Sequence, residues 1–391
     1  MRKTILILPL IFLLSCGENI KVQKLSVEEG KTFDRFHFKK VGEITLWGGW
    51  CLALPQGIFC FEVLDRRWSE FNFKLYDYSG ELIREKRVAG GEGPDQIRVT
   101  NFNSAWLSPS GKILCLDGNN YFKSIDPETL EIETIVKFSN VIEKYGSKYT
   151  FGMHSATSLE TKENRTVTSF ESSGFYEDMT YYIITYEGIF ENLSVIATAK
   201  KEKPWTWAKY RERKSYVDYY AIFRLERILS VDWKRGVVYY LPDIEKPEIE
   251  SIDLKGKRKE KYLIDIKFEK FKVEKEEFEL WYKYGLSETD PILKSYYESI
   301  LYIPSHAPAL MGIKVTGDWL LITTGNRNWK KGENEVLVYR LPSLKYEGSF
   351  FIPFSNRLLT KWYDGYYMTR NLIEKDDGYY ISHEVYTVEE K

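Results

Sequence analysis

Histidine is scarce in this 391-residue chain, and the few that occur are His37, His154, His306 and His383. Sites that use imidazole as base or metal ligand need several converging side chains, so this number leaves little material for them. Cysteine is also rare, and no histidine or acidic pair stands beside the four cysteines at the spacing of a zinc site. The 56 basic and 57 acidic residues nearly cancel, so global charge does not favour a nucleic-acid partner.

Motifs of the common catalytic sites are missing too. No Gly-x-Ser-x-Gly nucleophile elbow occurs, and Gly90-Gly91-Glu92-Gly93 lacks the Lys-Ser/Thr of a phosphate-binding loop. We interpret this glycine-rich stretch as a tight connection that needs positive φ angles. The stretch Asp117-Gly118-Asn119-Asn120 has too few ligands for a calcium loop. The sequence therefore predicts neither a cofactor nor a metal.

Only the N-terminus carries a long apolar run. Arg2 and Lys3 precede apolar residues 5–14, and Ser15-Cys16 follow. A basic head before about 7–15 apolar residues is typical of a secretory signal and is too short for a membrane-spanning helix. The small residue before the cysteine resembles the lipobox of bacterial lipoproteins. That resemblance implies cleavage after residue 15 and lipidation of Cys16; an ordinary signal peptide with an incidental cysteine is the alternative.

No second stretch approaches the roughly 18 apolar residues of a membrane span. We therefore expect residues 1–15 to be a signal peptide and the mature protein to be lipid-anchored in a bacterial cell envelope, facing the periplasm or the outer membrane. The sequence does not distinguish the inner from the outer membrane.

Cys51 and Cys60 flank the turn Leu54-Pro55-Gln56-Gly57 and face each other if a hairpin forms there. An exported compartment permits a disulfide between them. Both residues, however, lie in apolar runs, where a free cysteine behaves as a small buried hydrophobe. The local pattern favours two buried thiols, with the disulfide as the alternative.

A weak internal repeat organises the rest of the chain. Aromatic residues are abundant (29 Tyr, 22 Phe, 11 Trp), which favours strands. Short apolar strands separated by Gly or Asp turns recur in six segments, at residues 43–87, 104–126, 166–188, 228–256, 312–340 and 358–388. Four-stranded antiparallel units repeated in this way are typical of propeller blades. We predict an all-β fold, a six-bladed β-propeller over residues 40–390, with residues 16–39 as a tether and possible ring-closing strand; a β-sandwich or two unrelated β domains are the alternative.

Two segments interrupt the repeat. Residues 200–220 gather lysines and arginines around Trp205 and Trp207, a composition suited to stacking on a ligand or to covering a blade edge. Residues 268–302 show helical spacing, and Asp290-Pro291 has the pattern of a helix start. We predict a helical insertion between the fourth and fifth blades.

Three stretches resemble six-bladed β-propeller lipoproteins of bacteria, a group related to NHL-repeat propellers. They are the strand and turn at residues 73–82 (FKLYDYSGEL), the linker at 90–94 (GGEGP, followed by Asp95-Gln96 instead of Gly-Glu), and residues 304–309 (PSHAPA) before the fifth blade. The resemblance covers about two thirds of the mature chain and implies the ring fold and the envelope location. Its motifs are structural and do not identify an activity.

Two functions fit these patterns. The first is a non-enzymatic scaffold that binds a protein or carbohydrate, with His154, His306, Trp205 and Trp207 as candidate ligand-binding residues. The two histidines begin the third and fifth blades, where inner loops face the channel of a propeller; satisfying a loop hydrogen bond is the structural alternative for each. The second function is a propeller enzyme of lactonase, lyase or glycan-active type, with a metal or carboxylate site at the channel. We favour the scaffold and predict no nucleic-acid partner.

Overall fold

The computed structural model describes residues 20–390, except 48, 65–68, 98–104, 109–110, 118–120, 138–139, 141–155, 172–178, 189–190, 202–227, 244–245, 268–270, 275–305, 329, 354–357, 364 and 376–377. All 25 elements in this part of the chain are β-strands, so the fold is all-β as predicted. A search of the same residues finds no helix with the length and apolar character needed to cross a membrane.

The strands form six sheets, five of which are built from consecutive strands. The first holds β3 (Gly49–Leu54), β4 (Gly57–Val63), β5 (Glu70–Tyr76) and β6 (Leu82–Ala89). The second holds β7 (Trp106–Leu107), β8 (Ile113–Leu116), β9 (Tyr121–Ile125) and β10 (Ile132–Lys137). The third holds β11 (Ala156–Lys162), β12 (Arg165–Glu171), β13 (Met179–Glu187) and β14 (Glu191–Lys201).

The fourth sheet holds β15 (Leu229–Asp232), β16 (Val237–Tyr240), β17 (Glu248–Asp253) and β18 (Lys259–Ile264), with β1 (Lys21–Leu25) added at its edge. The fifth holds β19 (Leu310–Thr316), β20 (Trp319–Asn328), β21 (Glu333–Arg340) and β22 (Lys345–Pro353). The sixth joins β23 (Leu358–Tyr363), β24 (Tyr366–Lys375) and β25 (Gly378–Glu390) to β2 (Phe36–Leu46).

Side-chain alternation explains why these segments become strands. In β5, Phe71, Phe73 and Leu75 are buried while the residues between them are partly exposed. A strand with period-2 alternation buries one face against a neighbouring sheet. The hairpin turns use glycines such as Gly236 (φ +66°) and Gly317 (φ +56°), a conformation that other residues adopt at a cost.

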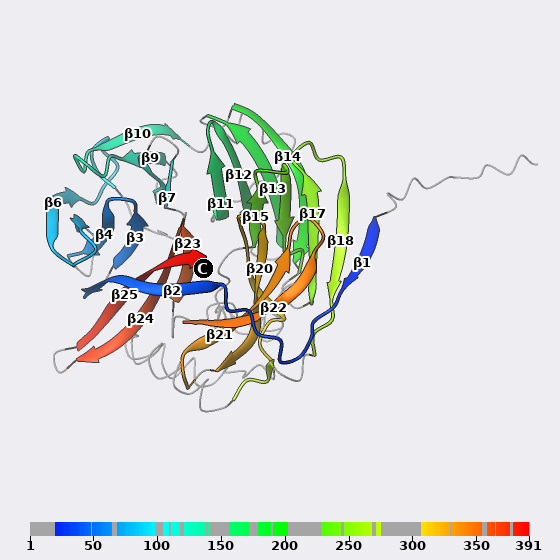
Figure 1. Ribbon diagram of the computed structural model, residues 1–391. Helices are drawn as coiled ribbons and strands as arrows, with labels where there is room; N and C mark the ends of the chain where they lie inside the picture. Colours follow the sequence, from blue (N-terminus) through cyan, green and yellow to red (C-terminus); the bar gives the residue numbers. More distant parts are fainter. Residues whose placement is uncertain are drawn as a thin grey trace, which may run out of the picture.

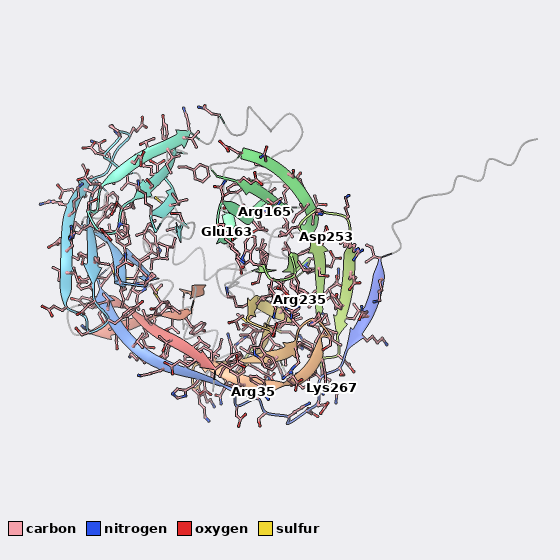
Figure 2. All side chains as sticks on the ribbon, turned by 45° about the horizontal axis from the view of Figure 1, so that its top comes forward. Arg35, Glu163, Arg165, Arg235, Asp253 and Lys267 are labelled. Atoms are coloured by element: carbon pink, nitrogen blue, oxygen red, sulfur yellow. A yellow bond between two sulfur atoms is a disulfide. The ribbon has the colours of Figure 1, made fainter. Side chains whose placement is uncertain are left out.

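Neighbouring sheets pack face to face, and in Figures 1 and 2 they follow one another around a common centre. Five apolar clusters of the described residues each join two neighbouring sheets. Their members include Phe73 with Ile125, Ile183 with Val238, Tyr239 with Leu320, Val338 with Tyr367, and Met368 with Cys60. Most of the core therefore lies between sheets.

The N-terminal and C-terminal parts of the chain meet in the sixth sheet. β2 pairs antiparallel with β25 over ten residue pairs, from Phe36↔Glu390 to Leu46↔Ile381. The sequence pattern divides the last repeat into two strands near residues 378–382 and 385–388; the structure instead has one continuous strand, β25. The fourth strand of the sixth sheet is therefore β2, from the N-terminal part of the chain, and not a second strand from the C-terminal segment.

The first strand has a different partner. β1 pairs parallel with β18, in register Lys21↔Glu260 to Leu25↔Ile264, and forms the outer edge of the fourth sheet. The fourth sheet is thus five-stranded, whereas the repeat predicts four strands.

Cys51 and Cys60 form a disulfide, with an S–S distance of 2.09 Å and a Cα–Cα distance of 4.1 Å. The expectation of two buried thiols is therefore wrong. The two residues are directly opposed in the β3–β4 hairpin, and opposed pairs of the closer type have Cα atoms about 4.5 Å apart, close enough for a disulfide. Both cysteines are buried, as the apolar context indicated.

The predicted helical insertion at 268–302 lies almost entirely outside the described residues. In its described part, residues 271–274, only Phe271 has a 3₁₀ conformation, and Lys272 forms an isolated antiparallel bridge with His306. The helical prediction for the rest of the segment remains a prediction.

Candidate functional site

Most of the predicted site residues lie outside the described residues: Cys16, His154, Trp205 and Trp207. His306 is described and exposed, and its backbone bridges to Lys272 four residues before β19 begins. Within the described ranges, no group of three or more His, Cys, Asp or Glu side chains is placed to hold a metal ion. The structure therefore places one of the predicted ligand-binding residues, and does so at the surface.

The described residues do contain a buried polar cluster where three sheets meet. Its members are Glu160 on β11, Ser230 on β15 and Lys314 on β19, which we call the Glu160 cluster. Each of these strands lies at one edge of its sheet, and β15 lies beside both β11 and β19. The cluster thus lies where the third, fourth and fifth sheets come together.

The geometry of the Glu160 cluster leaves its oxygens engaged. Ser230 Oγ donates to Glu160 Oε1 at 2.5 Å, and the Val231 backbone N–H donates to Glu160 Oε2 at 3.0 Å. Lys314 Nζ lies 3.5 Å from Glu160 Oε1. Val315 N–H in turn donates to Ser230 Oγ at 2.8 Å, so this hydroxyl oxygen already accepts a hydrogen bond.

These contacts fit an inter-sheet connection better than a nucleophile. A serine acts as a nucleophile when a base takes its proton and its oxygen faces substrate. Here Ser230 donates to a carboxylate that is ion-paired with Lys314, and the Ser230 hydroxyl oxygen accepts a hydrogen bond from the Val315 backbone N–H. The Glu160 carboxylate accepts two hydrogen bonds and pairs with Lys314, so both of its oxygens are bound within the protein.

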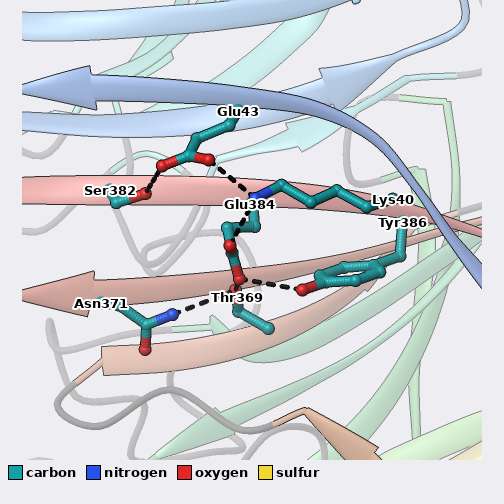
Figure 3. A network of polar contacts seen from close by, with 7 residues as sticks. All are labelled: Lys40, Glu43, Thr369, Asn371, Ser382, Glu384 and Tyr386. Atoms are coloured by element: carbon teal, nitrogen blue, oxygen red, sulfur yellow. Dashed lines mark hydrogen bonds and ion pairs between the residues drawn. The ribbon is translucent and has the colours of Figure 1, made fainter.

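A second polar network joins β2 to β24 and β25, and Figure 3 shows all seven of its residues. Lys40 Nζ lies 2.7 Å from Glu43 Oε2 and 2.6 Å from Glu384 Oε1. Ser382 Oγ donates to Glu43, and the hydroxyls of Tyr386 and Thr369 donate to Glu384. Asn371 Nδ2 extends the network to Thr369 at 3.5 Å. We call this the Lys40 network.

The charges of the Lys40 network stabilise one another. Burial alone lowers the pKa of Lys40, but hydrogen bonds to Glu384 and Glu43 outweigh it and raise that pKa above 10.5. The hydrogen bond from Lys40, helped by Ser382, lowers the pKa of Glu43 below 4.5. Burial and the hydrogen bond to Glu384 raise the pKa of Tyr386. The network is therefore a cation between two carboxylates across the neutral pH range.

A buried lysine fixes the glycine-rich stretch 90–96. Lys123 is 1% exposed and lies 3.4 Å from Asp117 Oδ2. Its ammonium donates to the backbone carbonyls of Gly93, at 3.0 Å, and of Gln96. Because a buried ammonium needs hydrogen-bond acceptors and a counter-charge, the loop and Asp117 together satisfy it.

The glycines of this loop do not have positive φ, and Gly91 and Gly93 lie close to the Gln96 side chain. Gly90, Gly91 and Gly93 are not among the positive-φ glycines, so that part of the interpretation is wrong. A Cβ added at Gly91 would lie 2.0 Å from Gln96 Oε1 and one at Gly93 3.0 Å from Gln96 Cδ. The Gln96 side chain folds back onto the loop, where its Oε1 accepts the Gly93 N–H at 3.0 Å.

The sequence predicts neither the Glu160 cluster nor the Lys40 network, although it contains a sign of the Glu160 cluster. Ser230 and Lys314 each stand between apolar residues, in Leu229-Ser230-Val231 and Ile313-Lys314-Val315. A polar residue inside an apolar strand needs a buried partner, which marks it for attention. Nothing in the local pattern links Lys40 to Glu384, because their contact depends on a pairing between opposite ends of the chain.

Comparisons with known proteins give no family. No family model and no curated protein matches this chain. Solved structures similar to it include a chain from an S. cerevisiae assembly of dbp5 with nup159, gle1, ip6 and adp, with 9% identity and a TM-score of 0.34, covering 90% of this chain and 77% of that one. Another is the N-terminal domain of Nup159, with 9% identity and a TM-score of 0.36, covering 95% of this chain and 99% of that one. Nothing about function follows from superpositions this loose.

Proposed function

We propose that this protein is an exported, lipid-anchored, six-bladed β-propeller that serves as a binding scaffold for a protein or carbohydrate at a bacterial cell envelope. The proposal of a propeller rests on the succession of six sheets around one centre, with apolar clusters between neighbouring sheets. Pairing of β2 with β25 supports a ring, because it places an N-terminal strand in the last sheet.

Export is supported by two independent features. The basic, apolar and Ser15-Cys16 pattern of the N-terminus has the form of a lipoprotein signal. The Cys51–Cys60 disulfide fits a chain that folds in an oxidising compartment, because disulfides persist outside the reducing cytosol.

The scaffold role is supported by how the polar groups between sheets are used. In the Glu160 cluster the carboxylate, the hydroxyl and the ammonium bind one another and the backbone, which gives them a structural task. A rigid set of sheets held by such contacts presents loops in fixed positions, which is what a binding protein requires.

The test begins with the full chain expressed in a bacterium beside Cys16→Ser. We expect the wild-type protein in the membrane fraction, lacking residues 1–15 and carrying lipid on Cys16 by intact mass. Cys16→Ser should remain unlipidated. Recovery of the wild-type chain without lipid would contradict the anchor.

An experimental structure of the same lipidated sample, with metal analysis, tests the ring and the scaffold role. We expect six blades, the fourth of them extended to five strands by β1, and a centre without a metal near His154 and His306. A bound metal there would favour the enzyme alternative and would direct work to hydrolase and lyase assays.

A further inference from the structure

We propose that the protein lies on an anionic membrane with the outer edge of its fourth sheet against the lipid headgroups. The surface concerned, which we call the basic edge, consists of Lys21 and Lys24 on β1 and of Lys255, Lys257 and Arg258 in the turn between β17 and β18. This inference rests on the lipid anchor of the proposed function and adds the orientation of the protein and its contact surface.

The pairing of β1 with β18 brings the two parts of the basic edge together. Because the pairing is parallel and begins at Lys21↔Glu260, the start of β1 lies beside the start of β18. The basic turn at residues 255–258 immediately precedes β18. Figure 2 labels Asp253, the last residue of β17, at the same end of the sheet as the start of β1. The chain therefore enters the fold next to a cluster of cations.

The side chains of the basic edge are available to solvent. Lys21, Lys24, Lys255, Lys257 and Arg258 are all exposed. Two carboxylates lie among them. Glu260 is 3.9 Å from Lys21, and Asp253 accepts the backbone N–H groups of Lys255, Lys257 and Arg258 at 2.9, 3.0 and 3.1 Å. The turn is thus held in shape by an acid that accepts from its backbone, and the basic edge as a whole has five exposed cations against these two acids.

The length of chain before β1 limits how far this edge can lie from the membrane. Five peptide steps separate Cys16 from Lys21, and a fully extended chain advances at most about 3.6 Å per residue, or roughly 18 Å in all. A lipid on Cys16 therefore keeps the start of β1 within about 18 Å of the headgroups. The opposite edge of the molecule, where β6 lies, has no such restraint.

The positive charge of the basic edge indicates which partner binds there. Basic residues close to an anionic bilayer are attracted to it, and a single lipid signal is commonly reinforced by a basic patch. The basic edge lies where the anchor would hold it, so lipid and cations act on the same side of the molecule. Anionic phospholipid headgroups are therefore the partner that fits.

The test uses two matched positions on opposite sides of the protein. Val22 on β1 and Ile83 on β6 are β-branched side chains of similar exposure, 56% and 51%, and Figures 1 and 2 place their strands on opposite sides. Val22→Cys and Ile83→Cys are introduced separately into the full, lipidated chain. The native background is low, because Cys51 and Cys60 are disulfide-bonded and burial raises the pKa of the Cys115 thiol to about 12.

Each variant is reconstituted into vesicles of phosphatidylglycerol and phosphatidylethanolamine and treated with a bulky maleimide. We expect the Val22→Cys thiol to react at least about fivefold more slowly than the Ile83→Cys thiol, and the two to react alike in detergent. Vesicles of phosphatidylcholine alone should reduce the difference. Equal reaction rates at both positions in anionic vesicles would overturn the orientation.

A charge variant separates the cations from the tether. Lys255→Gln, Lys257→Gln and Arg258→Gln together should raise the reaction rate of the Val22→Cys thiol in anionic vesicles by about fivefold. The control, Arg84→Gln with Lys162→Gln and Lys345→Gln, removes the same charge from scattered exposed sites and should leave the rate unchanged. Protection that survives loss of the basic turn overturns its role. A chain that carries no lipid by intact mass instead contradicts the anchor itself, so the two failures are distinguishable.

Discussion

Lys40 and Glu384 are 344 positions apart in the sequence, yet the Lys40 ammonium lies 2.6 Å from a Glu384 carboxylate oxygen. The pair spans the boundary between β2 and β25, so it connects the two ends of the folded chain. Glu43 lies on the other side of the same ammonium, at 2.7 Å. One cation thus separates two carboxylates that would otherwise repel.

Replacing this cation should weaken the sixth sheet. We expect Lys40→Met to lower the free energy of unfolding by about 1 kcal/mol, since the groups are partly exposed and the two glutamates then face each other. Urea unfolding followed by tryptophan fluorescence measures the change. Lys21→Met is the control, because it removes a more exposed lysine whose partner lies 3.9 Å away; an equal loss in both variants would contradict a special role for Lys40.

The same network predicts a pH dependence. The pKa of Glu43 is lowered from 4.5, so its stabilisation is complete above pH 4.5 and is lost as pH falls through the lowered value. The pKa of Lys40 is raised from 10.5, so its contribution is present below pH 10.5 and is lost as pH rises further. The difference in unfolding free energy between wild type and Lys40→Met should hold steady at neutral pH and shrink at strongly acidic pH. A difference that does not change with pH would argue against the ion pairs.

The Cys51–Cys60 disulfide closes a short loop, because the two cysteines are nine positions apart in the sequence. A cross-link of that span restricts the unfolded chain by about 2–3 kcal/mol. We expect a reducing agent to lower the stability of the wild-type protein by this amount and to leave Cys51→Ala/Cys60→Ala unaffected. Denaturant titrations with and without reductant give both values; Cys115→Ala should retain the full response to reductant.

Lys123 is buried, so its removal is expected to be costly. We expect Lys123→Met to lose about 3–5 kcal/mol, because it leaves the Asp117 carboxylate and two backbone carbonyls buried without the ammonium. The double variant Lys123→Met/Asp117→Asn should recover part of the loss, since the uncompensated charge is then gone. Thermal and urea unfolding of the two variants measure this coupling, and the absence of any recovery would contradict it.

Glu160 connects three sheets, so a substitution there acts on all of them. Glu160→Gln replaces one of the two oxygens that accept from Ser230 and Val231 with an amide NH₂ and removes the counter-charge of Lys314, and we expect a loss of about 2–3 kcal/mol. Exposed Glu163, in the adjoining turn, is the matched control, and Glu163→Gln should change stability by less than about 0.5 kcal/mol. Equal effects in urea unfolding would rule out the cluster as a connection between sheets.

Local pattern was enough to predict most of the strands. The alternation of Phe71, Phe73 and Leu75 and the turn at Gly236 are properties of a few adjacent residues, and the structure confirms the strands that they indicate. The pairing of β1 with β18 and of β2 with β25 is set by the packing of the whole chain, so no short window contains it. The two cysteines show the same limit, because an apolar strand suits a buried thiol and a buried disulfide equally well.

The candidate site was harder to predict for a related reason. The sequence pattern predicts His306 as a ligand-binding residue, and the structure places it at the surface. The buried polar groups that do connect the sheets are common residue types, Glu160, Ser230 and Lys314, and they become distinctive only through their neighbours in space. Sequence spacing carries no record of contacts between separate sheets.

The β2–β25 pairing also has a consequence for the order in which the chain folds during synthesis. β2 emerges early, whereas Gly378–Glu390, the segment that forms β25, is made only after all five other sheets. Until then the edge of β2 offers unpaired N–H and C=O groups, the kind of edge that invites wrong partners. During synthesis, therefore, β2 remains unpaired while most of the other sheets can already form. Factors that protect exposed strands would act during that interval.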